Sequence, residues 1–311
     1  MAILFATHLE PAQCAEWLAL LRAELPAETI VPTRGEEPID IALVANPPPG
    51  ALAGLPSLRL IQFLWAGVDK LLADPTLPEG VPLARMVDPA MNEAMAETAL
   101  WAVLGLQRDF FDYAAQQHRR LWVMHPQRRQ DEFVVAVLGL GQMGRAVVRR
   151  LVDNGYRVIG WSRGAASVEG IEAVSGDAGL ERALHEAAIV INLLPLTAQT
   201  RGLFKAATLA RMATGASLVN LARGAHVVDA DLLGALDRGH LAHAVLDVFH
   251  TEPLPPEHAF WRHPKVTVLP HVSAQTDPRS AASIVAANVR ALRGAVWAAA
   301  WGSTVTRGWR Q

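Results

Sequence analysis

The sequence is poor in cysteine and in clustered charge. Cys14 is the single cysteine among 311 residues, so the chain can form neither an internal disulfide nor a cysteine-based metal site. The formal net charge at pH 7 is -2, and basic residues occur in short, scattered pairs. These features argue against a broad surface for nucleic acid or lipid. We expect a cytoplasmic protein in a reducing compartment, with no metal site and no nucleic-acid or membrane partner.

Long hydrophobic runs are also missing. No apolar stretch reaches the roughly 18 residues that a membrane-spanning helix needs. The apolar first residues are interrupted by His8 and Glu10 before they resemble a secretion signal, so we expect no export. The hydrophobic fraction of 51% and the charged fraction of 19% are ordinary for globular proteins. Because a single core commonly stops growing beyond about 250 to 300 residues, we expect two domains.

Short strand-like runs alternate with helical patterns along the chain. One series starts with the strand-like run Ala2–Ala6 and the helical pattern Pro11–Glu24, and a second starts at Phe133–Leu138. This alternation is typical of open parallel sheets covered by helices. The alanine-rich stretch Asn92–Gln117 predicts one long connecting helix, and the helical pattern Pro278–Arg293 returns to the first series. The six strand-like runs of the second series suit a complete doubly wound sheet.

A turn rich in glycine follows the first strand of the second series, in the segment VVAVLGLGQMGRAVVRRL. Gly139 would permit a tight turn, Gly141 would let the backbone approach a pyrophosphate, and Gly144 would let the helix pack closely on the strand. Unpaired N–H groups near Gln142 and Met143 would then face the phosphates. A strand before the motif and a helix after it are the context that makes it specific. The sequence therefore predicts a dinucleotide site.

The end of the next predicted strand indicates which dinucleotide is bound. NAD-specific sites carry an acidic residue about 20 positions after the glycines, whereas an arginine favours the extra phosphate of NADP. Here Trp161, Ser162 and Arg163 occupy that place. Ser162 can donate a hydrogen bond to the phosphate, and Arg163 can pair with its charge. We expect a preference for NADP(H), with NAD(H) also usable; the alternative is that Arg163 is an ordinary surface residue.

Four loops follow later strands of the same series. Loops at the carboxyl ends of strands in an open α/β sheet line the ligand crevice, so these four should converge beside the nicotinamide. They span residues 194–197, 220–224, 247–254 and 270–274 and read LPLT, NLARG, DVFHTEPL and PHVSA. In the first two loops we expect cofactor contacts at Leu194, Pro195, Thr197, Leu221 and Ala222.

Together these motifs resemble those of the D-isomer-specific 2-hydroxyacid dehydrogenases, most closely the glyoxylate/hydroxypyruvate reductase branch. The resemblance covers nearly the whole dinucleotide domain and its flanking helices. It implies that Arg223, in an N-x-x-R-G motif, Glu252, in D-x-x-x-x-E-P-L, and His271 are the catalytic residues. It also implies that Asp247 forms a hydrogen bond with the nicotinamide ribose or amide. The alternative is that Asp247 is a structural cap of its loop.

The chemistry of a 2-oxoacid reduction needs these residue types. A guanidinium such as that of Arg223 can clamp the substrate carboxylate through paired hydrogen bonds. An imidazolium such as that of His271 can supply a proton as hydride arrives and charge builds on the carbonyl oxygen. Glu252, bonded to the other ring nitrogen, would orient the imidazole and favour its charged form.

A loop in the first series matches the family's substrate-carboxylate loop. Residues 64–69 read LWAGVD, and the backbone N–H groups of Ala66, Gly67 and Val68 could form an anion-binding concavity. An ordinary turn is the alternative. Trp65 would place a bulky ring at the mouth of the pocket, which favours a short substrate such as glyoxylate or hydroxypyruvate.

Some features leave alternatives open. Ser273 stands where the family has a small apolar residue after the histidine, and it could bond substrate or cofactor. The terminal tryptophans Trp297, Trp301 and Trp309 could pack a tail onto a core or partner, or contact substrate. Relatives are commonly dimers through the dinucleotide domain, which makes the segment Arg108–Trp122 a candidate homodimer contact; an intrachain helix pair is equally compatible.

These features predict an α/β fold with two doubly wound parallel-sheet domains. A Rossmann dinucleotide-binding domain, residues 101–277, is inserted into a flavodoxin-like substrate domain made of residues 1–100 and 278–311. The expected activity is NADPH-dependent reduction of a small 2-oxoacid to the D-2-hydroxyacid, with His271 as proton donor. The alternatives are an NAD-linked dehydrogenase of another D-2-hydroxyacid and a dinucleotide-sensing scaffold that binds other proteins.

Overall fold

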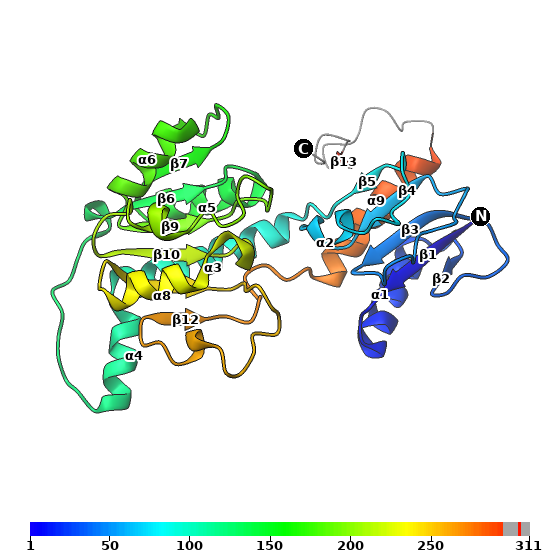
Figure 1. The fold of residues 1–311 in the computed structure, drawn as a ribbon. Coiled ribbons are helices and arrows are strands. Elements are labelled where there is room, and N and C mark those ends of the chain that lie inside the picture. Colours follow the sequence, from blue (N-terminus) through cyan, green and yellow to red (C-terminus); the bar gives the residue numbers. More distant parts are fainter. Residues whose placement is uncertain (295–303, 306–311) are drawn as a thin grey trace. The chain divides into compact units, whose positions relative to one another are not determined.

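The computed structural model describes residues 1–294 and 304–305. The chain divides into two compact units, Met1–Ala90 with Thr276–Gln311 and Met91–Gln275 (Figure 1). The sequence placed the first division near residue 100. In the structure it lies earlier because Met95, Ala99 and Val103 pack into the core of the second unit. The predicted tail tryptophans lie outside the described residues.

The first unit is built on a largely parallel sheet with the order β13-β5-β4-β3-β1-β2. The order of its parallel strands, 2-1-3-4-5, is the flavodoxin-like arrangement. Only the pairing of β13 with β5 is antiparallel. The strands are β1 Ala2–Thr7, β2 Ile30–Val31, β3 Ile39–Ala45, β4 Leu60–Phe63, β5 Leu83–Ala84 and β13 Thr304–Val305; the helices are α1 Pro11–Glu24, α2 Asp69–Leu72 and α9 Pro278–Arg293.

The returning helix α9 is tied to the first unit by charge. Arg293 forms ion pairs with Glu28 and with the fully buried Asp40. Arg290 donates to the backbone oxygen of Glu24 at the end of α1. A buried carboxylate must be paired to be tolerated, so Asp40 fixes where α9 ends against the sheet.

The second unit is built on a seven-stranded parallel sheet with the order β12-β11-β10-β9-β6-β7-β8. The strands are β6 Val134–Leu138, β7 Arg157–Ser162, β8 Glu172–Ser175, β9 Ile189–Asn192, β10 Ala216–Asn220, β11 Leu241–Leu246 and β12 Val266–Val268. The helices are α3 Pro89–Gln107, α4 Phe110–Arg119, α5 Gln142–Asp153, α6 Gly176–Glu186, α7 Ala206–Leu209 and α8 Asp229–Asp237, with 3-10 turns η1 Gln130–Glu132, η2 Gly224–His226 and η3 Ala259–Trp261. The chain reverses direction across the sheet between β6 and β9, which is where ligands bind in doubly wound folds.

Alternation along each strand builds two cores, one on each face of this sheet. Ala136 and Leu138 of β6 join a core that also holds Leu184 of α6. Val135 and Val137, one position out of phase, join the other core with Val147 of α5. Because both faces are covered by helices, the strands are apolar throughout, and this made them visible in the sequence.

The predicted single helix over residues 92–117 is wrong on one point, because the structure has two helices there. Helix α3 ends at Gln107 and α4 begins at Phe110. Asp109 between them adopts a left-handed backbone conformation with φ of 55°. Aspartate tolerates this conformation better than most residues, and its carboxylate accepts a hydrogen bond from Arg128 at 3.0 Å. Within the described residues, none of the helices is both long and apolar enough to cross a membrane.

Candidate active site

The glycine turn joins β6 to α5 at the point where the sheet reverses direction. Gly139 has φ of +107°, and a Cβ there would lie 2.9 Å from the carbonyl oxygen of Leu193. A Cβ on Gly144 would overlap the carbonyl oxygen of Gly139, so the helix packs directly on the turn. Gly141 has open space where its Cβ would be. Gln142 and Met143 start α5, and N–H groups of a first turn have no acceptor within their helix. The turn therefore fits a pyrophosphate against the Gly141 backbone.

The three predicted cofactor residues at the end of β7 have different environments. Trp161 is buried, and its indole nitrogen donates to the carbonyl oxygen of Gly176 at 2.9 Å. Ser162 is half-buried and donates to the carbonyl oxygen of Gly164 at 2.6 Å. Arg163 is exposed. Only Ser162 and Arg163 thus offer side chains to a ligand, while Trp161 is a core residue.

His271 and Glu252 form a direct pair. The imidazole Nδ1 lies 2.8 Å from the Glu252 Oε2. The other carboxylate oxygen, Oε1, accepts the backbone N–H of Phe249 at 2.9 Å. Because a carboxylate accepts hydrogen bonds, Nδ1 carries the proton and Nε2 is turned away from the pair. The His271 side chain is 50% exposed, so this nitrogen can reach a ligand.

Arg223 lies on a loop that packs against the loop of Glu252. A Cβ on Gly224 would overlap the backbone of Phe249, so only glycine allows the two loops to approach so closely. The half-buried Arg223 donates from Nη1 to the carbonyl oxygen of Ala222 at 2.7 Å. The glycine of the N-x-x-R-G motif thus brings the arginine loop beside the loop of the His271–Glu252 pair.

Asp247 caps the loop that carries His271. The residue is 1% exposed, and its carboxylate accepts the backbone N–H groups of Val272 at 2.7 Å and of Ser273 at 3.0 Å. Each oxygen is thus used within the unit, in agreement with a loop cap, and the contact of Asp247 with the nicotinamide stays a prediction. His271 itself has a left-handed backbone with φ of 56°, and the cap fixes the chain immediately after it.

Ser273 is buried rather than open to a ligand. Its backbone oxygen accepts a hydrogen bond from Thr98 Oγ1 at 3.1 Å. Its hydroxyl is inaccessible and has no hydrogen-bond partner among the described residues.

The loop after β9 exposes Pro195 and buries Leu194. Thr197 closes it by a mutual contact with Thr200, whose hydroxyl also donates to the Pro195 carbonyl oxygen at 2.7 Å. Leu221 and Ala222 after β10 are buried as well, so only their backbones remain for a cofactor.

The predicted substrate loop lies in the first unit, between β4 and α2. Ala66 and Gly67 are half-buried, and Val68 is buried. The Trp65 ring contacts Trp17 edge-on, with 6.3 Å between ring centroids. Its backbone oxygen accepts a hydrogen bond from Met86 at 3.1 Å. Trp65 therefore rests on the core of its own unit.

Sequence reasoning gave no role to three buried polar residues beside the predicted site. Asn192 and Asn220 are the last residues of the apolar strands β9 and β10, and His226 lies in the arginine loop. An amide side chain at the end of two consecutive apolar runs was the signal that could have found them.

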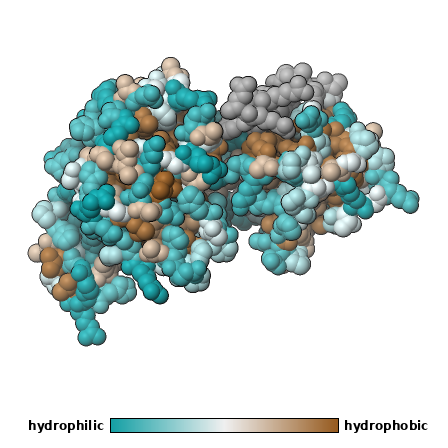
Figure 2. All heavy atoms as spheres, in the orientation of Figure 1, coloured by the Kyte–Doolittle hydropathy of each residue, from teal (hydrophilic) through white to brown (hydrophobic). Residues whose placement is uncertain are grey.

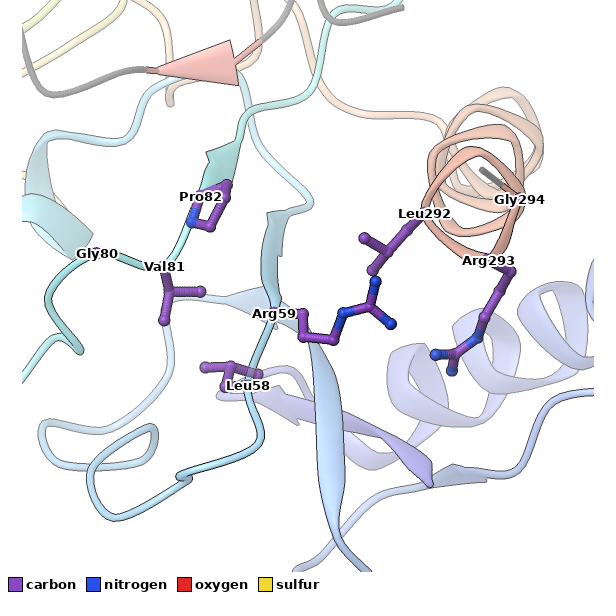
Figure 3. A pocket seen from close by; sticks show the side chains of 8 residues that line it. All are labelled: Leu58, Arg59, Gly80, Val81, Pro82, Leu292, Arg293 and Gly294. Carbon is purple, nitrogen blue, oxygen red and sulfur yellow. The ribbon is translucent and has the colours of Figure 1, made fainter. Parts of the chain in front are cut away.

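The first unit has a hollow of about 590 Å³ (Figure 3). None of the predicted site residues lines it. Its lining is Leu58, Arg59, Gly80, Val81, Pro82, Leu292, Arg293 and Gly294.

Comparison with known proteins explains this arrangement of loops. Residues 100–273 match the family model of the NAD-binding domain of D-isomer-specific 2-hydroxyacid dehydrogenases. The chain belongs to this family. The predicted family and fold class are thereby confirmed, and the chain is an NAD(P)-dependent dehydrogenase by membership.

Individual relatives extend the match to almost the whole chain. A glyoxylate/hydroxypyruvate reductase A of Serratia proteamaculans is 42% identical over 284 residues, which is 89% of this chain and 91% of the relative. A D-isomer-specific 2-hydroxyacid dehydrogenase of Xanthobacter autotrophicus Py2, solved with NADPH and MES, has a TM-score of 0.88 at 37% identity. An NADPH-dependent glyoxylate/hydroxypyruvate reductase of Sinorhizobium meliloti, solved with NADP and sulfate, has a TM-score of 0.87 at 33% identity. Both structural comparisons cover 94% of each chain.

Proposed function

We propose that this dehydrogenase uses NADPH to reduce a small 2-oxoacid, glyoxylate or hydroxypyruvate, to the D-2-hydroxyacid. The observation that carries the proposal is the 2.8 Å pair of His271 and Glu252 on loops at the carboxyl edge of the sheet that also bears the glycine turn. Relatives named glyoxylate/hydroxypyruvate reductase support the substrate class.

The preference for NADPH is supported by the end of β7. Arg163 is exposed there, and no carboxylate occupies the strand end that NAD-specific sites use. Two relatives were solved with NADPH or NADP. NAD(H) is the secondary cofactor, because the glycine turn binds the pyrophosphate that both dinucleotides share.

In this proposal each catalytic side chain has one task. A bound nicotinamide would supply the hydride that the carbonyl carbon accepts. His271 donates its Nε2 proton to the carbonyl oxygen, while Glu252 holds Nδ1 and stabilises the charged ring. The Arg223 guanidinium binds the substrate carboxylate through paired hydrogen bonds. The substrate loop at Ala66–Val68 stays a prediction from the sequence.

A spectrophotometric panel tests the function directly. Glyoxylate, hydroxypyruvate, pyruvate and phenylpyruvate are each assayed with NADPH and with NADH, at fixed protein concentration. We expect turnover of the first two with NADPH. Folded, NADPH-binding protein that turns over no member of the panel would overturn the proposal.

Removal of the proton donor separates chemistry from binding. His271→Ala should lower kcat by about a hundredfold to ten-thousandfold, the usual contribution of general acid catalysis. Its NADPH dissociation constant, measured by cofactor fluorescence, should change less than threefold. Glu252→Gln keeps the shape of the partner but not its charge, and it should lower kcat less than His271→Ala does. A His271→Ala enzyme with wild-type kcat would remove His271 from the mechanism.

The cytoplasmic homodimer predicted from sequence remains part of the proposal. The free Cys14 fits a reducing compartment. After α4, Trp122 is 93% exposed and Met124 84% exposed. Hydrogen bonds to Gln116 and Tyr113 hold the backbone of Val123 and His125 on the helix, so these apolar side chains are presented in fixed positions.

The exposed apolar side chains of this segment fit a second copy of the chain. Figure 2 shows apolar surface at the left edge of the view, where Figure 1 draws the segment after α4. Sedimentation velocity should give a dimer for the wild type and a larger monomer fraction for the double variant Trp122→Ser with Met124→Ser. A wild-type monomer at micromolar concentration would refute the dimer.

A further inference from the structure

Three buried polar side chains form one hydrogen-bonded cluster at the carboxyl ends of β9 and β10. Asn192, Asn220 and His226 are each 0% exposed. The amide nitrogen of Asn192 lies 2.9 Å from Asn220 Oδ1 and 3.0 Å from His226 Nδ1. An amide nitrogen only donates, so His226 Nδ1 is an acceptor and its ring is neutral with the proton on Nε2.

The tautomer of His226 agrees with its other contact. Nε2 lies 3.3 Å from the carbonyl oxygen of Pro195, which can only accept. Both ring nitrogens of His226 are therefore used, one toward Asn192 and one toward the loop after β9. A ring with this pair of contacts has one orientation.

Four side-chain hydrogen bonds lead from the cluster to the backbones of two predicted site loops. In the loop after β9, Asn192 Oδ1 accepts the N–H of Leu194 at 3.2 Å, and His226 holds the Pro195 carbonyl. In the arginine loop, Asn220 donates to the Arg223 carbonyl oxygen at 3.0 Å and accepts the N–H of Ala222 at 3.3 Å. The cluster thus joins the predicted cofactor loop to the predicted substrate-binding arginine.

Stability alone is a weak reason for such a cluster. Taking amide and imidazole groups out of water is costly, and apolar side chains of similar size hold strand ends as well or better. A fully satisfied polar network instead imposes one arrangement on the groups it contacts. The groups contacted here are the backbones of Pro195 and Arg223, on neighbouring loops.

We propose that His226 is a positioning residue that, with Asn192 and Asn220, fixes the Arg223 loop relative to the cofactor loop. The inference rests on the proposed reductase function. A clamp displaced by a fraction of an ångström still binds the oxoacid but holds its carbonyl poorly for hydride and proton transfer. The loss should therefore fall mainly on kcat rather than on cofactor binding.

The test compares His226 variants with a buried histidine elsewhere in the unit. His243 is 7% exposed and bonds Thr267 Oγ1 at 2.9 Å, at the opposite end of the strands, which makes His243→Gln the matched control. His226→Ala should lower kcat at least tenfold, with the NADPH dissociation constant within threefold of wild type. His243→Gln should leave kcat within twofold at temperatures where it is folded. Urea unfolding of each variant confirms that folded protein is assayed.

Two conservative variants identify which contact of His226 is needed. The glutamine amide nitrogen in His226→Gln lies near the position of Nε2, so this variant keeps a donor for Pro195 and should recover most of kcat. The shorter His226→Asn keeps a group for Asn192 but cannot reach Pro195, and it should resemble His226→Ala. If His226→Ala does not fold, these two variants carry the comparison.

The outcomes are distinct. Two results with an active wild type overturn the positioning role alone. One is an unchanged kcat in His226→Ala, and the other is an equal kcat in the glutamine and asparagine variants. A kcat loss in His243→Gln that matches that of His226→Ala assigns the effect to stability and also overturns it. An inactive wild type overturns the proposed function and this inference together.

Discussion

Asp247 and Glu252 stand five residues apart, and both carboxylates contact the segment around His271. Glu252 holds the imidazole through one oxygen and its own loop through the other. Asp247 holds the two N–H groups that follow His271. Backbone groups are therefore as important to the geometry of the pair as side chains are.

Ser273 provides a stability prediction because its buried hydroxyl lacks a partner within the described part of the chain. An unsatisfied buried polar group costs about 1–3 kcal/mol. Ser273→Ala should therefore raise the free energy of unfolding by about 1 kcal/mol in urea denaturation. Ser280→Ala is the matched control, since Ser280 donates to Asp88 at 2.6 Å, and it should lower the same quantity. Lower stability of Ser273→Ala would mean that the hydroxyl is satisfied in solution.

Arg163 provides a prediction about cofactor choice. Replacement by glutamate places a carboxylate at the end of β7, where it can accept hydrogen bonds from a ribose and repel a phosphate. Arg163→Glu should raise the KM for NADPH at least tenfold and lower the KM for NADH. Arg157→Glu, at the other end of the same strand, is the control and should change neither. An unchanged ratio of kcat/KM values in Arg163→Glu would leave Arg163 as a surface residue.

At the scale of elements, two glycines of the same turn should have different roles, one in cofactor binding and one in stability. Gly141 has φ of -72°, a conformation open to alanine, and empty space at its Cβ position. Gly141→Ala should keep the stability of the wild type but raise the NADPH dissociation constant at least tenfold, because the methyl group occupies the place of the pyrophosphate.

Gly144→Ala, in contrast, should lower the free energy of unfolding. Its methyl group would overlap the Gly139 carbonyl oxygen, which belongs to the backbone and cannot turn away. We expect a loss of about 1–3 kcal/mol, or no folded protein. Urea unfolding and NADPH fluorescence titration, applied to both variants, check the pair. Equal stability of the two alanine variants would contradict the packing seen at the turn.

Helices and strands were predictable where their burial produces a recognisable pattern of apolar residues. Strands such as β6 and β9 are apolar at successive positions because helices cover both faces of the sheet. The sequence pattern did not reveal β8, because Glu172–Ser175 is half-exposed at the edge of the sheet. It did not reveal β2 either, because that strand has only two residues. The break at Asp109 depends on Arg128, 19 positions away, which a helical pattern does not record.

The candidate site was predictable mainly from its motifs. The loops were located by their place after strands, and the individual roles of Arg223, Glu252 and His271 came from the resemblance to a family. The Asn192–Asn220–His226 cluster was missed because its members are separated by up to 34 positions and meet only in the fold. The place of Trp161 at a strand end did not reveal that its ring turns into the core, so its predicted cofactor contact would fall on its backbone.

At the scale of the whole molecule, His243 links stability to pH. Burial lowers the pKa of this histidine to about 4, with smaller contributions from the charges of His263 and Lys265. In the unfolded chain the imidazole has a pKa of about 6.5. Below that value the unfolded chain takes up a proton that the folded chain does not, so stability falls as the pH drops from about 6.5 to about 4.

The size of this effect can be measured. A pKa difference of about 2.5 corresponds to about 3 kcal/mol of unfolding free energy, fully lost near pH 4. His243→Gln cannot titrate, so its unfolding free energy should fall less steeply than that of the wild type between pH 6.5 and 4. The two proteins are compared by urea denaturation at each pH, with pH 7.5 as the reference. Parallel curves would show that His243 is accessible to protons in the folded state.

The hydrogen bond from Thr98 to the backbone of Ser273 joins residues 175 positions apart, near the entry and exit of the second unit. The parallel strands β1–β5 of the first unit all precede that insertion, and only α9 and β13 follow it. A block of chain whose two ends are fastened side by side can be gained or replaced in a gene as a cassette, without rebuilding the sheet that receives it. The cofactor-binding unit is thus an insertion whose two ends meet in the fold.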